Sequence, residues 1–284
     1  VFVARDRVGV KPLYFSFQDG LFLFASEIKA ILKHPEVERD IDPVAMYHYL
    51  SFLATPAPMT MFKGVNKLPA GHYMRVGNGG GVEAIRYWNA VPGQSISERD
   101  THGLSERALE DFYVAGIRSR LISAVEKRMM SDVPLGVLLS GGIDSSTNVA
   151  LLSRYTDRPI ETFTVGFKNH ARLNELEHAQ LVADRFKTKH HKVLMDEHDM
   201  FGYLDDLVFH QDEPIADWVC VPLYFVSKLA KDSGVTVVHV GEGADELFAG
   251  YSSYLDFLKA SSRWWDPFQR WVPLTMHPLL SAVA

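Results

Sequence analysis

The sequence predicts an α/β protein in which a doubly wound parallel sheet follows a smaller, β-rich region. Two patterns support this fold class. Beyond residue 105, short apolar runs alternate with amphipathic segments, which is typical of repeated βα units. Before residue 91, pairs of short apolar runs flank glycine-containing turns, which is typical of antiparallel hairpins. The chain has 284 residues, enough for one large domain or two smaller ones at roughly 150 residues per domain.

Composition excludes several classes of protein. Hydrophobic residues make up 47% and charged residues 23% of the chain, which is ordinary for a folded globular protein. The net charge of −6 gives no electrostatic support for nucleic-acid binding. The sequence contains no run of about 18 apolar residues, so no membrane span is predicted. The single cysteine excludes an intrachain disulfide and fits a reducing compartment, so we expect a cytoplasmic protein.

The first region is predicted to contain two hairpins. Residues 13–17 and 21–25 flank a turn at 18–20, whose Asp-Gly pair tolerates positive φ. Residues 73–76 and 82–88 flank a second turn that is rich in glycine. Both pairs are therefore expected to form antiparallel strands.

Two helices and a linker are predicted next to these hairpins. Ser26 is expected to cap a short helix that ends at Lys33. A second helix is expected over Pro43–Phe52, because proline is favoured in the first turn of a helix. Residues 91–104 are poor in apolar residues and rich in Pro, Gly, Ser and charges, so we expect a linker between a domain at 1–90 and a domain at 105–284.

The second region follows a helix–strand alternation. Apolar residues recur every three or four positions over 105–130, which predicts an amphipathic helix. Residues 135–139 form an unbroken apolar run, as expected for a strand whose two faces are both covered by helices. Further strands are expected at 160–165, 191–195 and 235–240, and helices near 145–155, 174–187, 198–211 and 222–232.

The sharpest chemical signal follows the predicted strand 135–139, in the segment Ser140-Gly141-Gly142-Ile143-Asp144-Ser145-Ser146. The two glycines let the backbone turn tightly, and the N–H groups at the start of the next helix attract an anion. The segment lacks the lysine of the Walker pattern, so pyrophosphate or a β,γ-phosphate pair is the expected ligand. Asp144 would repel phosphate without a cation between them, which implies Mg²⁺. The alternative is a Gly-Gly turn that only joins strand to helix.

A second signal follows the predicted strand 235–240, in the segment Gly241-Glu242-Gly243-Ala244-Asp245-Glu246. Its three carboxylates repel one another unless cations or hydrogen-bond donors compensate. Ligands of open α/β sheets bind at the carboxyl ends of the strands, where both segments lie. We therefore expect a second Mg²⁺ ligand and a proton acceptor here. The alternative is helix capping by exposed acids.

These two segments, with their surroundings, resemble the glutamine-dependent asparagine synthetases. Residues 131–146 are similar to that family's pyrophosphate-loop signature, and 4–14 with 24–30 look like the closing part of its class II glutaminase domain. Further similarity lies at 162–167, 212–214 and 241–251. The Ser-Gly-Gly-x-Asp-Ser loop alone is shared with other ATP pyrophosphatases, whereas the combination is far more specific.

The resemblance implies both a fold and a reaction. Residues 105–284 would form a doubly wound sheet of the ATP-pyrophosphatase (adenine nucleotide alpha-hydrolase-like) type, and residues 1–90 the C-terminal part of an α+β, Ntn-type glutaminase domain. The reaction would be the ATP-dependent amidation of aspartate to asparagine through β-aspartyl-AMP. The implied ligands are small molecules, namely aspartate, ATP with Mg²⁺, and ammonia derived from glutamine. No nucleic acid or membrane partner is expected, and a homodimer stays an open alternative.

The resemblance also implies residue roles. Adenosine would be contacted by Leu139, Val165, Val240 and Gly241. Pyrophosphate would be held by Ser140, Gly141, Gly142, Ser145 and Ser146. Asp144 and Asp245 would hold Mg²⁺, and Glu242 would serve in intermediate formation and as the base that accepts a proton from attacking ammonia.

Some positions depart from the family pattern. The family's nucleophilic cysteine begins the mature chain, whereas Val1 stands first here, so we expect a fragment that lacks both termini and does not hydrolyse glutamine by itself. Some members carry Arg where Trp218 stands and Ser where Val240 stands. Two alternatives therefore stay open, the same chemistry on another carboxylate such as a sugar uronate or a β-amino acid, and a nucleotide-binding module without turnover.

Overall fold

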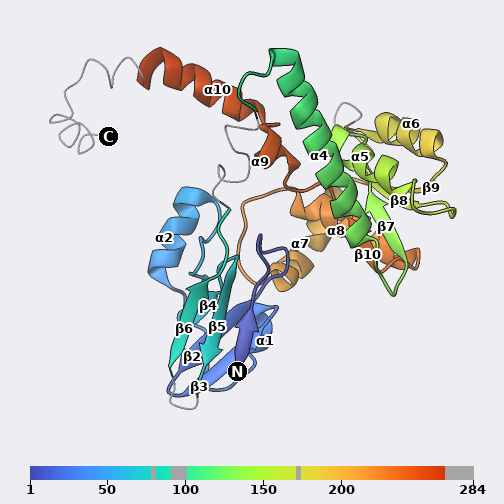
Figure 1. Cartoon of the computed structure of the whole chain (residues 1–284). Coiled ribbons are helices and arrows are strands. Elements are labelled where there is room, and N and C mark those ends of the chain that lie inside the picture. Colours follow the sequence, from blue (N-terminus) through green and yellow to red (C-terminus); the bar gives the residue numbers. More distant parts are fainter. Residues whose placement is uncertain (78–80, 91–100, 171–173, 266–284) are drawn as a thin grey trace. The chain divides into compact units, whose positions relative to one another are not determined.

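The computed structural model describes residues 1–77, 81–90, 101–170 and 174–265 (Figure 1). The chain divides into two compact units. The first comprises Val1–Ser119 and Met195–Phe225, and the second Arg120–Leu194 and Val226–Ala284. Most of the predicted linker at 91–104 lies outside the described residues.

The first unit contains two small antiparallel sheets. One has the order β1 (Phe2–Ala4), β5 (His72–Val76), β6 (Val82–Arg86), and the other β3 (Leu21–Ala25), β2 (Tyr14–Gln18), β4 (Val65–Lys67). Both predicted hairpins are confirmed, since β2 pairs with β3 and β5 with β6. Asp19 and Gly20 both take positive φ, at 48° and 81°, as the sharp turn between β2 and β3 requires.

The helices of this unit are α1 (Ile28–Ile31) and α2 (Pro43–Phe52). The prediction for α2 is confirmed, with Asp42 capping it through the N–H groups of Val44 and Ala45. The predicted cap of α1 is wrong. Its N-terminal flanking residue is Glu27 rather than Ser26, no neighbouring side chain caps it, and the helix ends at Ile31 rather than Lys33.

Alternation along the strands gives this unit two apolar clusters. Ile28 and Ile31 of α1 pack with Tyr14, Leu23 and Val65 on one face of the β3-β2-β4 sheet. The residues next in sequence face the other way and pack with the β1-β5-β6 sheet, in a cluster of Val3, Leu68, Met74, Leu13, Phe15, Phe22 and Val82.

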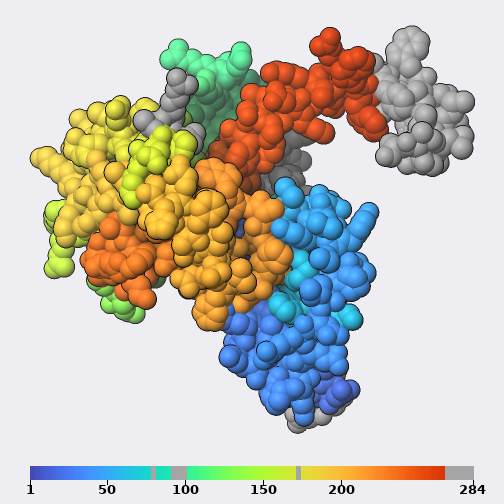
Figure 2. Space-filling model, turned by 180° about the vertical axis from the view of Figure 1, so that it is seen from behind, coloured from blue at the N-terminus to red at the C-terminus, as the bar shows by residue number. Residues whose placement is uncertain are grey.

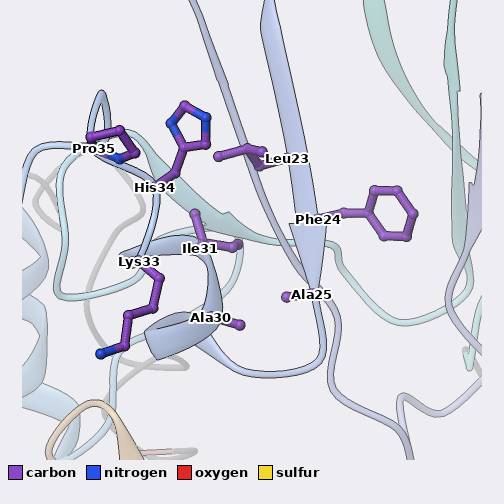
Figure 3. A pocket seen from close by; sticks show the side chains of 8 residues that line it. All are labelled: Leu23, Phe24, Ala25, Ala30, Ile31, Lys33, His34 and Pro35. Atoms are coloured by element: carbon purple, nitrogen blue, oxygen red, sulfur yellow. The ribbon is translucent and has the colours of Figure 1, made fainter.

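A cavity of about 380 Å³ opens between β3 and α1. Most of its lining is apolar, and Figure 3 shows the Lys33 ammonium pointing away from Leu23 and Phe24. None of the predicted site residues lines it. The cavity is therefore not the site that the sequence predicts.

Residues 195–225 belong to the first unit because two acidic side chains anchor them there. They contain α7 (Glu197–Gln211) and the start of α8 (Cys220–Asp232). After α7, Asp212 accepts a hydrogen bond from the Ile28 N–H at 2.7 Å and pairs with Lys29 at 3.0 Å. Figure 2 shows this amber part of the chain lying against the blue N-terminal residues. Asp212 thereby caps α1 from a distant point of the sequence.

Glu213, the next residue, makes a matching pair of contacts. It forms an ion pair with Lys67 and accepts a hydrogen bond from the Met61 N–H at 3.1 Å. Its side chain is only 5% exposed. A buried carboxylate with two charge-assisted partners stabilises the fold through both of them.

We expect Glu213→Gln to lower the free energy of unfolding by about 2 kcal/mol, because an amide keeps the shape but loses the charge that Lys67 and the Met61 N–H face. Urea denaturation measures the change. The matched control is Asp232→Asn, which removes the same charge from an exposed ion pair with Lys228 and should change stability by less than about 0.5 kcal/mol. Equal effects of the two substitutions would contradict the anchoring role.

The second unit contains a four-stranded sheet in the order β10 (Val237–His239), β7 (Leu135–Leu138), β8 (Glu161–Phe167), β9 (Lys189–Met195). The pairs β10–β7 and β7–β8 are parallel, as predicted. The chain runs from β7 to β8 and β9 on one side, and β10 lies on the other side of β7. The strand order therefore reverses between β7 and β10, which is the switch point where open α/β sheets bind ligands.

Helices cover both faces of this sheet. On one face, Val137 and Leu139 pack against α4 (Glu106–Arg128), α5 (Ile143–Leu152) and α6 (Leu176–Phe186). On the other, Phe163 and Val238 pack against Val226 and Ala230 of α8. The predicted doubly wound arrangement follows from this alternation along β7 and β8.

Three short helical segments end the described chain, namely α9 (Ala244–Phe248), α10 (Ser252–Ala260) and the π-helix η2 (Ser261–Trp265). Across the residues that the structure describes, no helix has the length and apolar character needed to cross a membrane.

Candidate ATP-binding site

The two predicted segments lie at the carboxyl ends of β7 and β10, the strands that flank the switch point. We name them the first loop (residues 139–146) and the second loop (residues 240–246). The first loop leads into α5, and the second leads into α9. Both lie in the second unit. The sheet topology therefore brings the two segments together although about a hundred residues separate them.

The first loop is held by its own serines. Ser145 is buried, and its Oγ lies 2.9 Å from Ser140 Oγ and accepts a hydrogen bond from the Ser140 N–H. Ser140 Oγ in turn accepts from the Gly142 N–H at 3.1 Å. The first hydrogen bond of α5 runs from the Ser146 N–H to Gly142, so the preceding N–H groups of the first turn stay open for an anion.

Gly141 is required by the geometry of this loop. Its φ is +87°, a left-handed conformation that other residues rarely adopt. A Cβ at this position would lie 2.5 Å from the backbone N of Ala179 and 2.6 Å from His178. The loop backbone therefore packs directly on the first turns of α6, which a side chain would prevent.

Ser146 carries a polar atom without a partner. Its Oγ is buried, and no hydrogen-bond partner for it occurs among the described residues. Leaving a buried hydroxyl unsatisfied costs about 1–3 kcal/mol. A ligand that accepts this hydrogen bond would remove that penalty, so the loop fits an anionic group such as a phosphate.

The second loop touches the first at Gly241. A Cβ on Gly241 would lie 3.2 Å from Asp144 Cβ and 3.3 Å from the Ser145 backbone N. Absence of a side chain at Gly241 thus allows the two loops to approach each other at the start of α5. The two motifs are therefore in contact in the fold.

The acidic residues of the site differ in exposure. Asp144 and Asp245 are half-buried, whereas Glu242 is exposed. None of the three has an ion-pair partner within the described ranges. Asp144 lies at the start of α5 beside Gly241, so its uncompensated charge would attract a cation there. Among the described residues, no group of three or more His, Cys, Asp or Glu side chains is arranged to hold a metal ion by itself.

Glu246 has a different role, because it accepts a hydrogen bond from the Tyr251 hydroxyl at 3.0 Å. This hydrogen bond, with burial and nearby negative charge, raises the pKa of Tyr251 to about 12. At neutral pH the Tyr251 phenol is protonated and donates its hydrogen bond to Glu246. The carboxylate of Glu246 is engaged by Tyr251, which lies just after the second loop, whereas that of Glu242 is open to solvent.

The expected adenosine contacts lie at the strand ends. Leu139 is buried, and its carbonyl accepts a hydrogen bond from the Thr164 hydroxyl. Val165 is half-buried and packs in the cluster around Phe163. Val240 is 39% exposed at the start of the second loop. The side chains of Leu139 and Val165 are thus part of the protein core, so a nucleotide would meet mainly their backbone.

Two polar residues that act on this site lie outside its two loops. Thr164 fixes the carbonyl of Leu139, as described above. Asn148 of α5 donates a hydrogen bond from Nδ2 to the Val240 carbonyl at 3.1 Å. Thr164 lies within the segment 162–167 that is similar to the asparagine synthetases, whereas no sequence pattern marks Asn148. Their partners, Leu139 and Val240, follow other strands.

Comparison with known proteins identifies the family of this chain. Residues 116–282 match the asparagine synthase family, and residues 1–88 match a glutamine amidotransferase domain. The chain therefore belongs to the asparagine synthase family, as the motifs indicated.

Individual relatives show the same similarity. A putative glutamine-hydrolysing asparagine synthetase 2 of Methanocaldococcus jannaschii is 34% identical over 90% of this chain and 48% of that protein. The glutamine-hydrolysing asparagine synthetase 1 of Bacillus subtilis is 34% identical over 99% of this chain and 41% of that protein. The amidase chyE of Penicillium rubens is 30% identical over 94% of this chain and 40% of that protein. The chain thus spans less than half the length of each of these relatives.

Proposed function

We propose that the protein containing this chain is a carbon–nitrogen ligase that amidates aspartate to asparagine at the expense of ATP, with ammonia derived from glutamine. The observation that carries the proposal is the meeting of the two loops at the switch point, with Gly241 against Asp144 and Ser145. The buried, unpartnered Ser146 hydroxyl adds a place for a phosphate oxygen. Similarity to named asparagine synthetases supplies the reaction class.

In this proposal, residues 1–90 form the C-terminal part of a glutaminase domain of Ntn type, 91–104 a linker, and 105–284 an ATP-pyrophosphatase domain. The boundaries of the two family matches, at 88 and 116, support this division. Residues 195–225 would then be a part of the second domain that packs within the first compact unit.

The proposed reaction has two steps. An oxygen of the aspartate β-carboxylate attacks the α-phosphorus of ATP, and pyrophosphate leaves. The nitrogen of ammonia then attacks the acyl carbon of the adenylate, AMP leaves, and Glu242 accepts the proton that the nitrogen loses. In this scheme the pyrophosphate portion is bound by the open N–H groups at the start of α5 together with Ser140, Gly141, Gly142, Ser145 and Ser146. Adenosine is contacted by Leu139, Val165, Val240 and Gly241.

In this proposal Asp144 and Asp245 would be the carboxylate ligands of Mg²⁺, with substrate phosphates and waters completing the set. This ion is commonly bound by one or two carboxylates together with substrate phosphates and waters, and both carboxylates lack an ion-pair partner among the described residues. When bound there, Mg²⁺ would neutralise charge on the departing pyrophosphate.

We expect Asp144→Asn to raise the Mg²⁺ concentration required for half-maximal pyrophosphate release about tenfold, which corresponds to about 1.4 kcal/mol of binding free energy. The amide keeps the shape of the side chain beside Gly241 but provides a weaker ligand. Titration of Mg²⁺ at fixed ATP in the full-length protein measures the change. An unaltered Mg²⁺ dependence would remove Asp144 from the proposed ligand set.

The identity of the carboxylate is the part of the proposal that needs its own test. One relative of comparable identity is named an amidase rather than an asparagine synthetase, so similarity at this level does not by itself define the reaction. Pyrophosphate release from ATP should be measured in the full-length protein with a panel of carboxylates. We expect release that depends on aspartate. Release with a sugar uronate or β-amino acid and none with aspartate would change the acceptor, and release with no carboxylate at all would favour a nucleotide-binding module.

A further inference from the structure

Asn148 lies in the middle of α5, outside the motifs, and its side chain reaches the second loop. Its Nδ2 donates a hydrogen bond to the carbonyl oxygen of Val240 at 3.1 Å. Val240 directly precedes Gly241 and Glu242. The amide of Asn148 therefore links the helix that follows the first loop to the start of the second.

This hydrogen bond is one of two contacts on the same stripe of α5. Asp144 and Asn148 are four residues apart, so both lie on one side of the helix. The Asp144 end of the stripe meets Gly241, and the Asn148 end meets Val240. A neighbouring stripe that includes Val149 is buried in the core of the unit. Core packing thus holds α5 in place, and the contacts of Asp144 and Asn148 hold the second loop against α5.

The residue type at position 148 also points to a tertiary role. Asparagine is a poor residue for a helix interior, because its side chain competes for backbone hydrogen bonds. Thr147, its neighbour, shows the local alternative, since its hydroxyl donates to the Ile143 carbonyl one turn earlier at 2.7 Å. Asn148 instead uses its donor on a strand end that is distant in sequence.

We propose that Asn148 is a positioning residue that sets Val240 and Gly241 at the distance from the first loop that ATP requires. This inference rests on the proposed function, in which Val240 and Gly241 contact adenosine. Asn148 itself is not placed in contact with ATP. Its effect on the nucleotide passes through the Val240 carbonyl.

The experiment compares Asn148→Ala, Asn148→Gln and the matched control Thr147→Val in the full-length protein. The control removes a hydrogen bond within the same helix, between the Thr147 hydroxyl and the Ile143 carbonyl. Two quantities are measured, the rate of amide hydrogen exchange over residues 240–246 and the KM for ATP in aspartate-dependent pyrophosphate release. A thermal melt of each variant gives its stability.

We expect Asn148→Ala to speed hydrogen exchange over 240–246 and to raise the KM for ATP, each by about fivefold, with kcat changed less than twofold. Asn148→Gln, which keeps the donor, should fall between Asn148→Ala and the original protein, and Thr147→Val should leave both quantities unchanged. A variant that was only destabilised would contain less folded, active protein. Its apparent kcat would then fall while its KM for ATP stayed the same.

Two results would overturn the inference. One is unchanged exchange over 240–246 in Asn148→Ala, and the other is faster exchange with an unchanged KM for ATP. If the proposed function itself is wrong, the results differ. The original protein would then release no pyrophosphate with any carboxylate, but the difference in hydrogen exchange between Asn148→Ala and Thr147→Val would remain.

Discussion

Replacing Glu242 by Gln is expected to slow amide formation by about 10²–10⁴-fold, the usual contribution of a general base. The amide keeps the size of the side chain but does not accept the proton that attacking ammonia loses. Glu242 is exposed at the start of the second loop and has no ion-pair partner among the described residues, so its removal leaves the first loop intact. Asparagine formation from ammonium salts in the full-length protein measures the rate, and calorimetric titration measures ATP affinity, which should be retained.

The matched control is Glu246→Gln, which removes the same charge from the same segment. The carboxylate of Glu246 is engaged by the Tyr251 hydroxyl, and we expect its loss to change the rate by less than about fivefold. The base role of Glu242 is refuted if Glu242→Gln forms asparagine at the original rate. Equal losses in the two variants would instead show that only the total charge of the loop matters.

Gly141→Ala is expected to lower the free energy of unfolding by about 4 kcal/mol and to abolish measurable ATP binding. The substitution is unfavourable for two reasons. The backbone φ of residue 141 is +87°, which is unfavourable for alanine, and the added Cβ would overlap the backbone at His178 and Ala179. Relief of that overlap moves either the first loop or α6. Denaturant unfolding and ATP titration measure the two effects.

Gly142→Ala is the control for that substitution. Gly142 flanks α5 with φ of −67°, which alanine adopts readily, and the nearest atom to an added Cβ is Ser140 Oγ at 3.3 Å. We expect a change in stability of less than about 1 kcal/mol. Similar stabilities for Gly141→Ala and Gly142→Ala would contradict the close packing of the first loop on α6.

Local sequence patterns predicted most of the elements near the site. The apolar run at 135–139 became β7, and the glycine-rich segment after it became the loop into α5, because both depend on residues within a few positions of each other. Alternating βα units also placed the two loops at strand ends. Only the observed strand order, with β10 beside β7, shows that they lie at one switch point.

Interactions between distant residues were beyond such patterns. The first turn of α1 is capped by Asp212 rather than Ser26, across 184 positions of the chain, so no local rule identifies it. Asn148 and Thr164 act on the site through the carbonyls of Val240 and Leu139, which lie 92 and 25 positions away, so local patterns do not identify either partner. Local patterns therefore predicted the strands and loops near the site but missed the short strands β1 and β4, and they do not identify a side chain whose partner lies elsewhere in the tertiary fold.

The most direct test of the proposed reaction follows oxygen atoms. Aspartate labelled with ¹⁸O in its β-carboxylate should be incubated with ATP, Mg²⁺ and ammonia in the full-length protein, and the phosphorus products analysed by mass. Attack of the carboxylate on the α-phosphorus predicts that ¹⁸O appears in AMP and that pyrophosphate is unlabelled. Label in inorganic phosphate with formation of ADP, or no labelled nucleotide at all, would contradict the account.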